Sequence, residues 1–158
     1  MSANLQTTPE LPATRRRPST AARRFGYLIA ILVNAAILYL INVEPSWRVV
    51  PFLTSATVAV LPWINGSIIV GMAANLVYLF TDQRWVRAAG DLATTAVGLA
   101  AMFQLWIVFP FEFHPAAPWT LLTRILITLA IAGSAIAIVV QLIRFVQVLA
   151  RPPRHDGT

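Results

Sequence analysis

Four apolar stretches, each long enough to cross a lipid bilayer as a helix, divide this 158-residue chain. A transmembrane helix needs about 20 mostly apolar residues, and inside hydrocarbon a helix satisfies its own backbone hydrogen bonds. The composition agrees, because 58% of the residues are hydrophobic and only 11% are charged, against about 25% charged residues in soluble domains. The sequence therefore predicts an all-α membrane protein with a four-helix transmembrane bundle, whose spans cover residues 25–43, 61–80, 90–109 and 120–149.

The basic residues indicate which ends of these spans face the cytoplasm. All 12 are arginines, and basic residues close to a span are retained on the cytoplasmic side. Two arginines, Arg48 and Arg124, fall at the opposite ends of the spans. The others are distributed so that both termini are predicted to be cytoplasmic: Arg15, Arg16, Arg17, Arg23, Arg24, Arg84, Arg87, Arg144, Arg151 and Arg154.

The domain organisation follows from this topology. Residues 1–24 are basic and rich in Pro, Ser and Thr, which predicts a disordered cytoplasmic tail. Residues 25–149 form the transmembrane domain, and residues 150–158 form a second cytoplasmic tail. The net charge of +6 lies mainly beside the membrane, so anionic lipid headgroups are a more economical partner than nucleic acid. No nucleic-acid binding is expected.

The segment before the second span permits two interpretations. The run from Val49 to Phe80 is too long for one straight crossing of about 20 residues. The favoured interpretation places a short surface or re-entrant segment at Phe52–Val60, followed by a span that starts near Leu61 with Pro62 in its first turn, where proline is tolerated. The alternative is one long helix that is kinked at Pro62.

Small residues at four-residue spacing recur in three of the spans, and such stripes let the backbones of membrane helices approach closely. We therefore expect close packing rather than a substrate groove along these stripes. They comprise Ser67, Gly71 and Asn75 in the second span, Gly90, Thr94 and Gly98 in the third, and Ala130, Ser134 and Ile138 in the fourth, with Gly133 and Ala137 alongside.

A polar cluster is predicted in the cytoplasmic half of the bundle. Asp91, in the first turn of the third span, and Arg144, near the end of the fourth, should lie at similar depth. We expect them to form an ion pair or a water-bridged equivalent. In the alternative, Asp91 caps its helix and Arg144 extends to the headgroups; a proton relay is less favoured. The full inner cluster is Asn75, Tyr78, Asp91, Thr94, Gln141 and Arg144.

A second polar cluster is predicted at the outer surface. Arg124 lies about one turn inside its span and needs a counter-ion, for which Glu112 or Glu44 is expected. A structural salt-bridge network is favoured over a metal site formed by Glu44, Glu112 and His114, because the arginines neutralise the carboxylates. The full outer cluster is Asn42, Glu44, Arg48, Glu112, His114 and Arg124.

Three runs of residues carry a family resemblance: Asn42-Val43-Glu44-Pro45, then Asn75-Leu76-Val77-Tyr78 with Asp82 and Trp85, then Val108-Phe109-Pro110-Phe111-Glu112-Phe113. With these motifs the chain resembles small four-span integral membrane proteins of high-GC actinobacteria, over most of residues 25–147. The resemblance implies a four-span fold and a location in the plasma membrane. It implies no activity.

The function expected from these features is non-catalytic. No catalytic motif or cofactor site is apparent, and the chain has no cysteine, which excludes thiolate chemistry. An accessory or scaffold subunit that associates with other membrane proteins or with itself is favoured. The alternative is a small oligomeric transporter or channel, which requires Asn34, Asn75, Asp91 and Arg144 to converge on one cavity. A third class is an enzyme that acts on a lipid or quinone at the outer face through Glu112, His114 and Arg124.

Overall fold

A computed structural model describes residues 19–81, 83–114 and 116–150 of the chain. The described part is built from four α-helices, joined at one end by loops that include a short 3₁₀-helix, and all four are long and apolar enough to cross a membrane. The prediction of an all-α, four-helix, multi-pass membrane protein is confirmed. In chain order the elements are α1 (Thr20–Asn42), the 3₁₀-helix η1 (Trp47–Val49), α2 (Thr57–Phe80), α3 (Arg84–Val108) and α4 (Ala116–Leu149).

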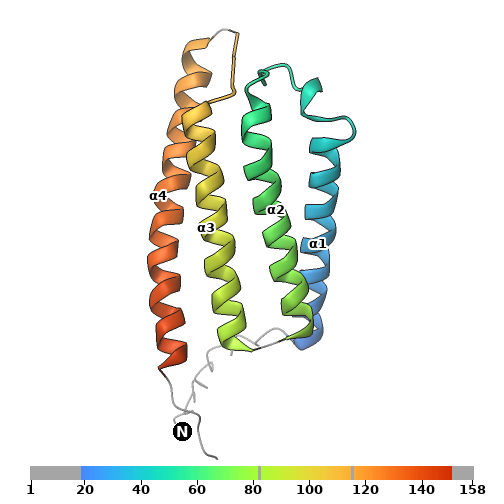
Figure 1. Cartoon of the computed structure of the whole chain (residues 1–158), viewed down its shortest axis with the longest axis vertical. Helices are drawn as coiled ribbons and strands as arrows, with labels where there is room; N and C mark the ends of the chain where they lie inside the picture. The colour runs from blue at the N-terminus through green and yellow to red at the C-terminus, as the bar shows by residue number, and fades with distance from the viewer. Residues whose placement is uncertain (1–18, 82, 115, 151–158) are drawn as a thin grey trace, which may run out of the picture.

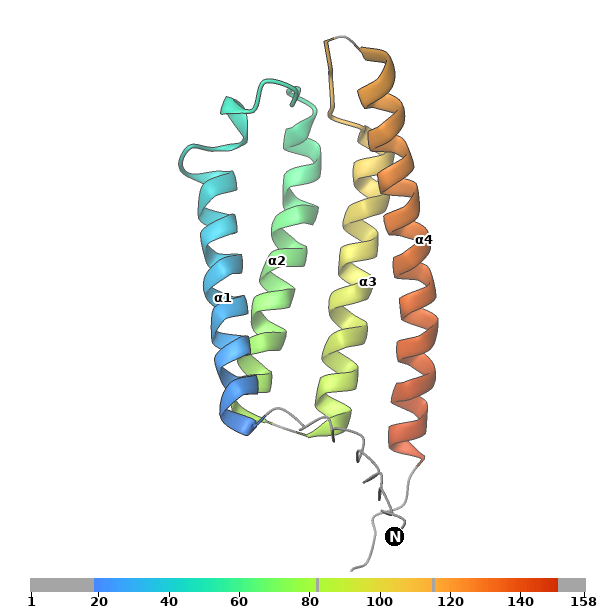
Figure 2. The ribbon, with the colours of Figure 1, turned by 180° about the vertical axis from the view of Figure 1, so that it is seen from behind.

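The helices are antiparallel and each packs against its neighbour in the sequence. Figures 1 and 2 show them side by side in the order α1, α2, α3, α4. Within the described residues, Cα atoms approach within 8 Å between α1 and α2, between α2 and α3, and between α3 and α4, but not between α1 and α4 or other non-sequential helices. The bundle is therefore an open row of helices with α1 and α4 at its two edges.

Few side chains are shielded from the surroundings in this arrangement. Among the described residues the buried ones are Thr57, Val60, Tyr78, Ala101, Pro110 and Ile127. Large apolar side chains cover the outward faces of every helix, as with Leu32 on α1 and Ile136 on α4. In water such a surface favours aggregation, whereas hydrocarbon tails solvate it at no cost. The burial pattern is that of a chain folded in lipid.

Helix α1 begins earlier than the predicted first span. The Ser19 hydroxyl accepts a hydrogen bond from the backbone N–H of Ala22 (3.2 Å), and this N-cap stabilises the first turn. The prediction of a disordered tail over residues 1–24 is therefore wrong for residues 20–24, which are helical. Residues 1–18, and residues 151–158 of the predicted C-terminal tail, lie outside the described part of the chain.

The segment between α1 and α2 differs from both interpretations of residues 49–62. A loop follows η1, and α2 starts at Thr57, after a tight turn in which the N–H of Thr57 donates to the carbonyl of Thr54 (3.0 Å). Residues 57–60 are helical and not part of a separate surface segment. Pro62 consequently lies in the second turn of α2, where its missing N–H leaves the carbonyl of Val58 without the usual helical partner.

The two loops at the opposite end from the N-terminus of α1 are joined by backbone hydrogen bonds. Leu53 and Phe111 form an antiparallel bridge. The N–H of Glu112 donates to the carbonyl of Phe52 (2.9 Å), and the N–H of Thr54 donates to the carbonyl of Pro110 (3.0 Å). These bonds link the α1–α2 hairpin to the α3–α4 hairpin.

Phenylalanine rings reinforce this connection between the loops. The ring of Phe113 stacks with that of Phe52, at a centroid separation of 5.5 Å, and with that of Phe111, at 6.0 Å. Phe111 in turn meets Phe109 edge-on at 5.4 Å. Aromatic pairs of this geometry stabilise by about 0.5–1.5 kcal/mol beyond their buried area. We call this end of the bundle, with residues 43–56 and 109–114 and the adjoining turns of the four helices, the loop end.

Candidate functional site

The antiparallel row sorts the described arginines between its two ends. The N-termini of α1 and α3 lie together with the C-termini of α2 and α4 (Figure 1). We call this the arginine end because it contains Arg23, Arg24, Arg84, Arg87 and Arg144, whereas Arg48 and Arg124 belong to the loop end.

Tyr78 is the centre of a polar contact between α2 and α3 at the arginine end. Its side chain is 7% exposed. Its hydroxyl lies 2.9 Å from Oδ1 of Asp91 and 3.0 Å from the backbone oxygen of Arg87, and donates to these two acceptors. The inner cluster thus does bring Tyr78 and Asp91 together, as the sequence predicted.

Gly90 allows Tyr78 to approach this closely. A Cβ atom at position 90 would overlap the Tyr78 hydroxyl and would lie 2.8 Å from Cζ and 2.9 Å from Cε1 of the same ring. Side-chain carbons do not approach to such distances without displacement of one group. The small-residue stripe of the third span is therefore a packing surface at Gly90, whereas a Cβ at Gly98 would meet nothing within 4 Å.

The contact extends to α1 through a second tyrosine. The Tyr27 ring meets that of Tyr78 edge-on, with centroids 5.6 Å apart. The guanidinium carbon of Arg87 lies 5.8 Å from the centroid of the Tyr27 ring, within the range of a cation–π interaction. Sequence reasoning missed Tyr27 and Arg87 as members of the site, because their meeting depends on how α1 is rotated about its axis.

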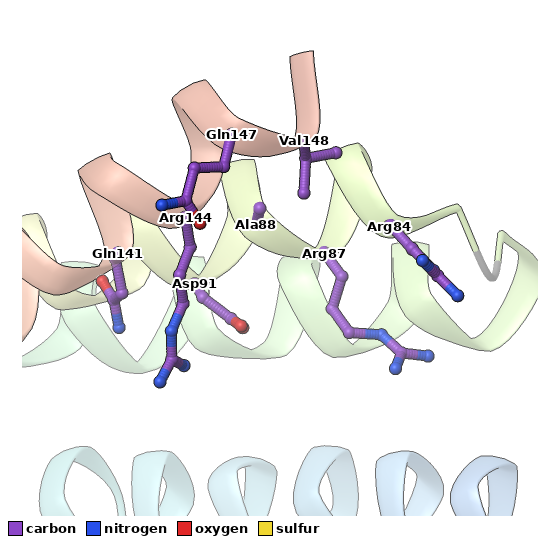
Figure 3. A pocket seen from close by; sticks show the side chains of 8 residues that line it. All are labelled: Arg84, Arg87, Ala88, Asp91, Gln141, Arg144, Gln147 and Val148. Carbon is purple, nitrogen blue, oxygen red and sulfur yellow. The ribbon is translucent and has the colours of Figure 1, made fainter. Parts of the chain in front are cut away.

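The expected direct ion pair between Asp91 and Arg144 does not form. No carboxylate–guanidinium pair within 4.0 Å joins them among the described residues, and Asp91 accepts instead from Tyr78. The helix-capping alternative also fails, because α3 starts at Arg84 and its first turn holds no acidic residue. Asp91 and Arg144 do line one groove, together with Gln141 (Figure 3).

The remaining members of the inner cluster bond within their own helices or line the groove. The Asn75 amide donates to the carbonyl of Gly71 (2.7 Å), and the Thr94 hydroxyl donates to that of Gly90 (2.9 Å). The Thr94 hydroxyl also lies 3.0 Å from the backbone carbonyl of Asp91. All of these bonds stay within one helix, and none reaches the Asp91 carboxylate. Gln141 differs, because its Oε1 is buried and has no hydrogen-bond partner in the described part of the chain.

The groove has a volume of about 320 Å³. It lies between the first turns of α3 and the last turns of α4, and in Figure 3 the side chains of Gln141, Arg144, Asp91 and Arg87 extend to the same side of this helix pair. The groove combines cationic, amide and apolar groups. Its lining residues are Arg84, Arg87, Ala88, Asp91, Gln141, Arg144, Gln147 and Val148.

At the loop end, aromatic rings rather than carboxylates contact Arg124. Its guanidinium carbon lies 4.2 Å from the centroid of Phe109 and 5.2 Å from that of Trp106. Arg48 similarly lies 5.7 Å from the ring of Trp47. The predicted salt-bridge network is wrong for the described residues, because no ion pair forms among Glu44, Arg48, Glu112, His114 and Arg124.

Two members of the outer cluster share a surface groove. Glu112 and His114 line it together with Phe52, Phe113 and Trp119. Glu44 does not line this groove, and the described residues contain no group of three or more His, Cys, Asp or Glu that could hold a metal ion. The geometry therefore gives no support to a metal at Glu44, Glu112 and His114.

Asn42, the remaining member of the outer cluster, pairs with a residue that the sequence analysis did not select. The amides of Asn42 and Asn65 exchange hydrogen bonds of 3.0 and 2.7 Å between α1 and α2. Such reciprocal amide pairs join membrane helices without a charge. Asn65 carries no signal in the sequence that distinguishes it from other polar residues of the spans.

An apolar cavity of about 470 Å³ also lies at the loop end, between α1, α2 and the paired loops. Its wall includes Trp47, Val60 and Leu105. The one buried polar side chain in this wall belongs to Thr57, whose hydroxyl has no hydrogen-bond partner in the described residues. The cavity suits an apolar group such as a lipid tail.

Comparison with protein-family models, with curated protein sequences and with solved structures finds no match to this chain.

Because Arg124 contacts aromatic rings and not Glu112, we expect the loss of Arg124 to destabilise the protein more than the loss of Glu112 does. Arg124→Gln is expected to lower the free energy of unfolding by about 1 kcal/mol, because it removes a cation from two ring faces. Glu112→Gln is expected to change it by less than about 0.5 kcal/mol. Denaturant titration of both variants in detergent micelles measures the difference; equal losses would restore the salt-bridge interpretation.

Proposed function

We propose that this chain is a non-catalytic accessory or scaffold subunit of a larger assembly in the bacterial plasma membrane, with both termini in the cytoplasm. The observation that supports the proposal is the open row of helices. Each edge helix, α1 or α4, has one packed neighbour in the described chain. A row of this kind leaves two broad faces and two edges for another membrane protein.

The surface of α4 supports a protein partner in addition to lipid. Ile127 is its one buried side chain among the described residues. Gly133 is exposed, and a Cβ atom at this position would meet nothing within 4 Å. Inside the chain this glycine serves no close contact, whereas on a helix surface a missing side chain allows another helix to approach.

The transporter or channel alternative finds less support in the geometry. It requires Asn34, Asn75, Asp91 and Arg144 to share a cavity. Asp91 and Arg144 line the groove at the arginine end, but Asn75 bonds to its own helix and Asn34 faces Gly71 at the α1–α2 contact. The four side chains do not line a common cavity in the described residues.

The lipid- or quinone-modifying alternative requires three other residues to act together. Glu112 and His114 share a groove, but Arg124 lies against Phe109 and Trp106. The groove thus lacks the cation that this mechanism assigns to it, and we favour the accessory role.

The proposal is tested by purification from the native membrane. The full chain, tagged and expressed at its natural level, is extracted in a mild detergent, and native mass spectrometry gives the composition of the complex. We expect a second membrane protein at fixed stoichiometry. Gly133→Leu is expected to reduce its recovery several-fold, because the added side chain blocks helix approach.

Gly98→Leu is the matched control for this experiment, since Gly98 also has open space around it but is only partly exposed and lies on the inner helix α3. It should leave partner recovery unchanged. Purification of the chain alone, as a monomer or as a homo-oligomer, would contradict the accessory role.

A further inference from the structure

The groove at the arginine end is lined by more cationic than anionic side chains. Three guanidinium groups, from Arg84, Arg87 and Arg144, line it with a single carboxylate, that of Asp91. Neither Arg84 nor Arg144 forms an ion pair with another described residue. Asp91 already accepts a hydrogen bond from Tyr78. An anion is therefore the ligand that this groove favours electrostatically.

The geometry of the cations indicates the class of anion. Guanidinium groups present paired N–H donors that match the oxygens of a phosphate. In Figure 3 the side chains of Arg144 and Arg87 extend to the same side of the α3–α4 pair, the side on which α1 lies. Two cations from different helices on one side of a groove suit a phosphate group, whose several oxygens accept from both.

The position of the groove indicates where the phosphate comes from. Its residues lie in the first two turns of α3 and in the last turns of α4. Helix α4, with 34 residues, has a length of about 51 Å at about 1.5 Å per residue, so it extends well beyond a hydrocarbon core of about 30 Å. The groove is therefore at the depth of lipid headgroups, and Ala88 and Val148 supply an apolar wall.

Two oxygens in the groove can accept hydrogen bonds from a ligand that carries O–H or N–H donors. Oε1 of Gln141 is buried and has no donor among the described residues. The Asp91 carboxylate uses Oδ1 for Tyr78, which leaves its second oxygen. A headgroup with hydroxyls satisfies such acceptors, whereas a choline headgroup offers no N–H or O–H donor.

We propose that this groove is a binding site for the phosphodiester of an anionic phospholipid with a hydroxylated headgroup, of the phosphatidylglycerol type. Arg144 and Arg87 bind the phosphate oxygens, and Arg84 adds charge at the mouth. Asp91 and Gln141 accept hydrogen bonds from the headgroup hydroxyls. The site fixes one lipid against the α3–α4 pair.

The test compares lipid retention by the full chain and two sets of variants. Protein purified in a non-ionic detergent is incubated with phosphatidylglycerol or with phosphatidylcholine, and native mass spectrometry measures bound lipid. The wild-type chain is expected to retain phosphatidylglycerol in preference to phosphatidylcholine. Arg144→Gln is expected to weaken binding about tenfold, which corresponds to one charge-assisted contact.

Arg24→Gln is the matched control, because Arg24 is an exposed arginine at the same end and does not line the groove. It should retain lipid as the wild type does. Arg84→Gln, at the first residue of α3, provides a second groove variant if Arg144→Gln does not fold. Circular dichroism and gel filtration establish the fold of each protein.

Three results would overturn the assignment. Equal loss of lipid in Arg24→Gln and in the groove variants would indicate diffuse surface charge. Equal retention of both lipids by the wild-type chain would exclude recognition of the anionic headgroup. Saturation of the protein by inorganic phosphate, with no phosphatidylglycerol retained, would assign the groove to a soluble phosphate instead.

Discussion

Gly90→Ala is expected to lower the free energy of unfolding by about 1–3 kcal/mol, the usual cost of overpacking. The added methyl group would overlap the Tyr78 hydroxyl and lie 2.8 Å from Cζ. Tyr78 is 7% exposed and hydrogen-bonded to α3, so its ring has little room to withdraw. Denaturant titration in micelles, followed by circular dichroism, measures the loss.

Gly98→Ala is the control, since it adds the same group to the same helix where nothing lies within 4 Å. It should be neutral or stabilising, because alanine forms helices better than glycine. Combining Gly90→Ala with Tyr78→Phe should recover part of the loss, as the hydroxyl is removed but the ring carbons remain. Equal stability of the two alanine variants would show that α2 and α3 do not approach as described.

Tyr78→Phe alone is expected to lower the free energy of unfolding by roughly 1–2 kcal/mol. The variant loses the hydrogen bonds of the hydroxyl, one of which has the carboxylate of Asp91 as its acceptor. The phenylalanine ring keeps the packing against Tyr27 and leaves the carbonyl of Arg87 and the carboxylate of Asp91 without this donor. Denaturant titration in micelles measures this loss of stability.

Tyr39→Phe is the matched control for this loss, because Tyr39 is 53% exposed on α1 and no hydrogen bond of its hydroxyl is seen among the described residues. It should change stability by less than about 0.5 kcal/mol. A Tyr78→Phe variant as stable as Tyr39→Phe would mean that water replaces the hydroxyl without cost.

The helices were predictable because each apolar stretch is long enough to span a bilayer and each is bounded by charges, prolines or polar turns. The ends of the helices at which polar residues gather were predictable for the same reason, and Tyr78 does meet Asp91. The start of α2 was not predictable from Pro62, because a tight turn at Thr54–Thr57 begins the helix before the proline.

Partners of the charged residues were less predictable because depth does not specify rotation about a helix axis. Asp91 and Arg144 reach the same groove, but the Tyr78 hydroxyl is the group that bonds to the carboxylate. A carboxylate was predicted as the partner of Arg124 because an opposite charge was expected beside it. Its guanidinium lies instead over the rings of Phe109 and Trp106. The pairing of Leu53 with Phe111 joins loops far apart in the sequence, and no local pattern indicates it.

The proposed lipid and the proposed protein partner bind to different parts of the open row. A lipid fixed between α3 and α4 at the arginine end would occupy one part of an exposed face, while the edge helices remain available to a protein partner. Binding of the lipid and of the partner then involves different residues, Arg144 for the first and Gly133 for the second. Each variant should therefore affect one binding event and leave the other unchanged.

Spin-label distances across the row test the central claim most directly. The chain has no cysteine, so pairs of labels require no removal of native thiols. One pair joins Leu32 on α1 to Ile136 on α4, and a second joins Leu32 to Ile69 on α2; all three positions are exposed. Double electron–electron resonance in lipid nanodiscs, with labelled chains diluted by unlabelled ones, gives both distances.

Packed helices are about 8–10 Å apart. In an open row, α4 is therefore farther from α1 than α2 is by about two helix spacings, roughly 15–20 Å. We expect the Leu32–Ile136 distance to exceed the Leu32–Ile69 distance by about this amount. Equal distances would show that α4 packs against α1 in a closed bundle, and would contradict both the open row and the partner surface that depends on it.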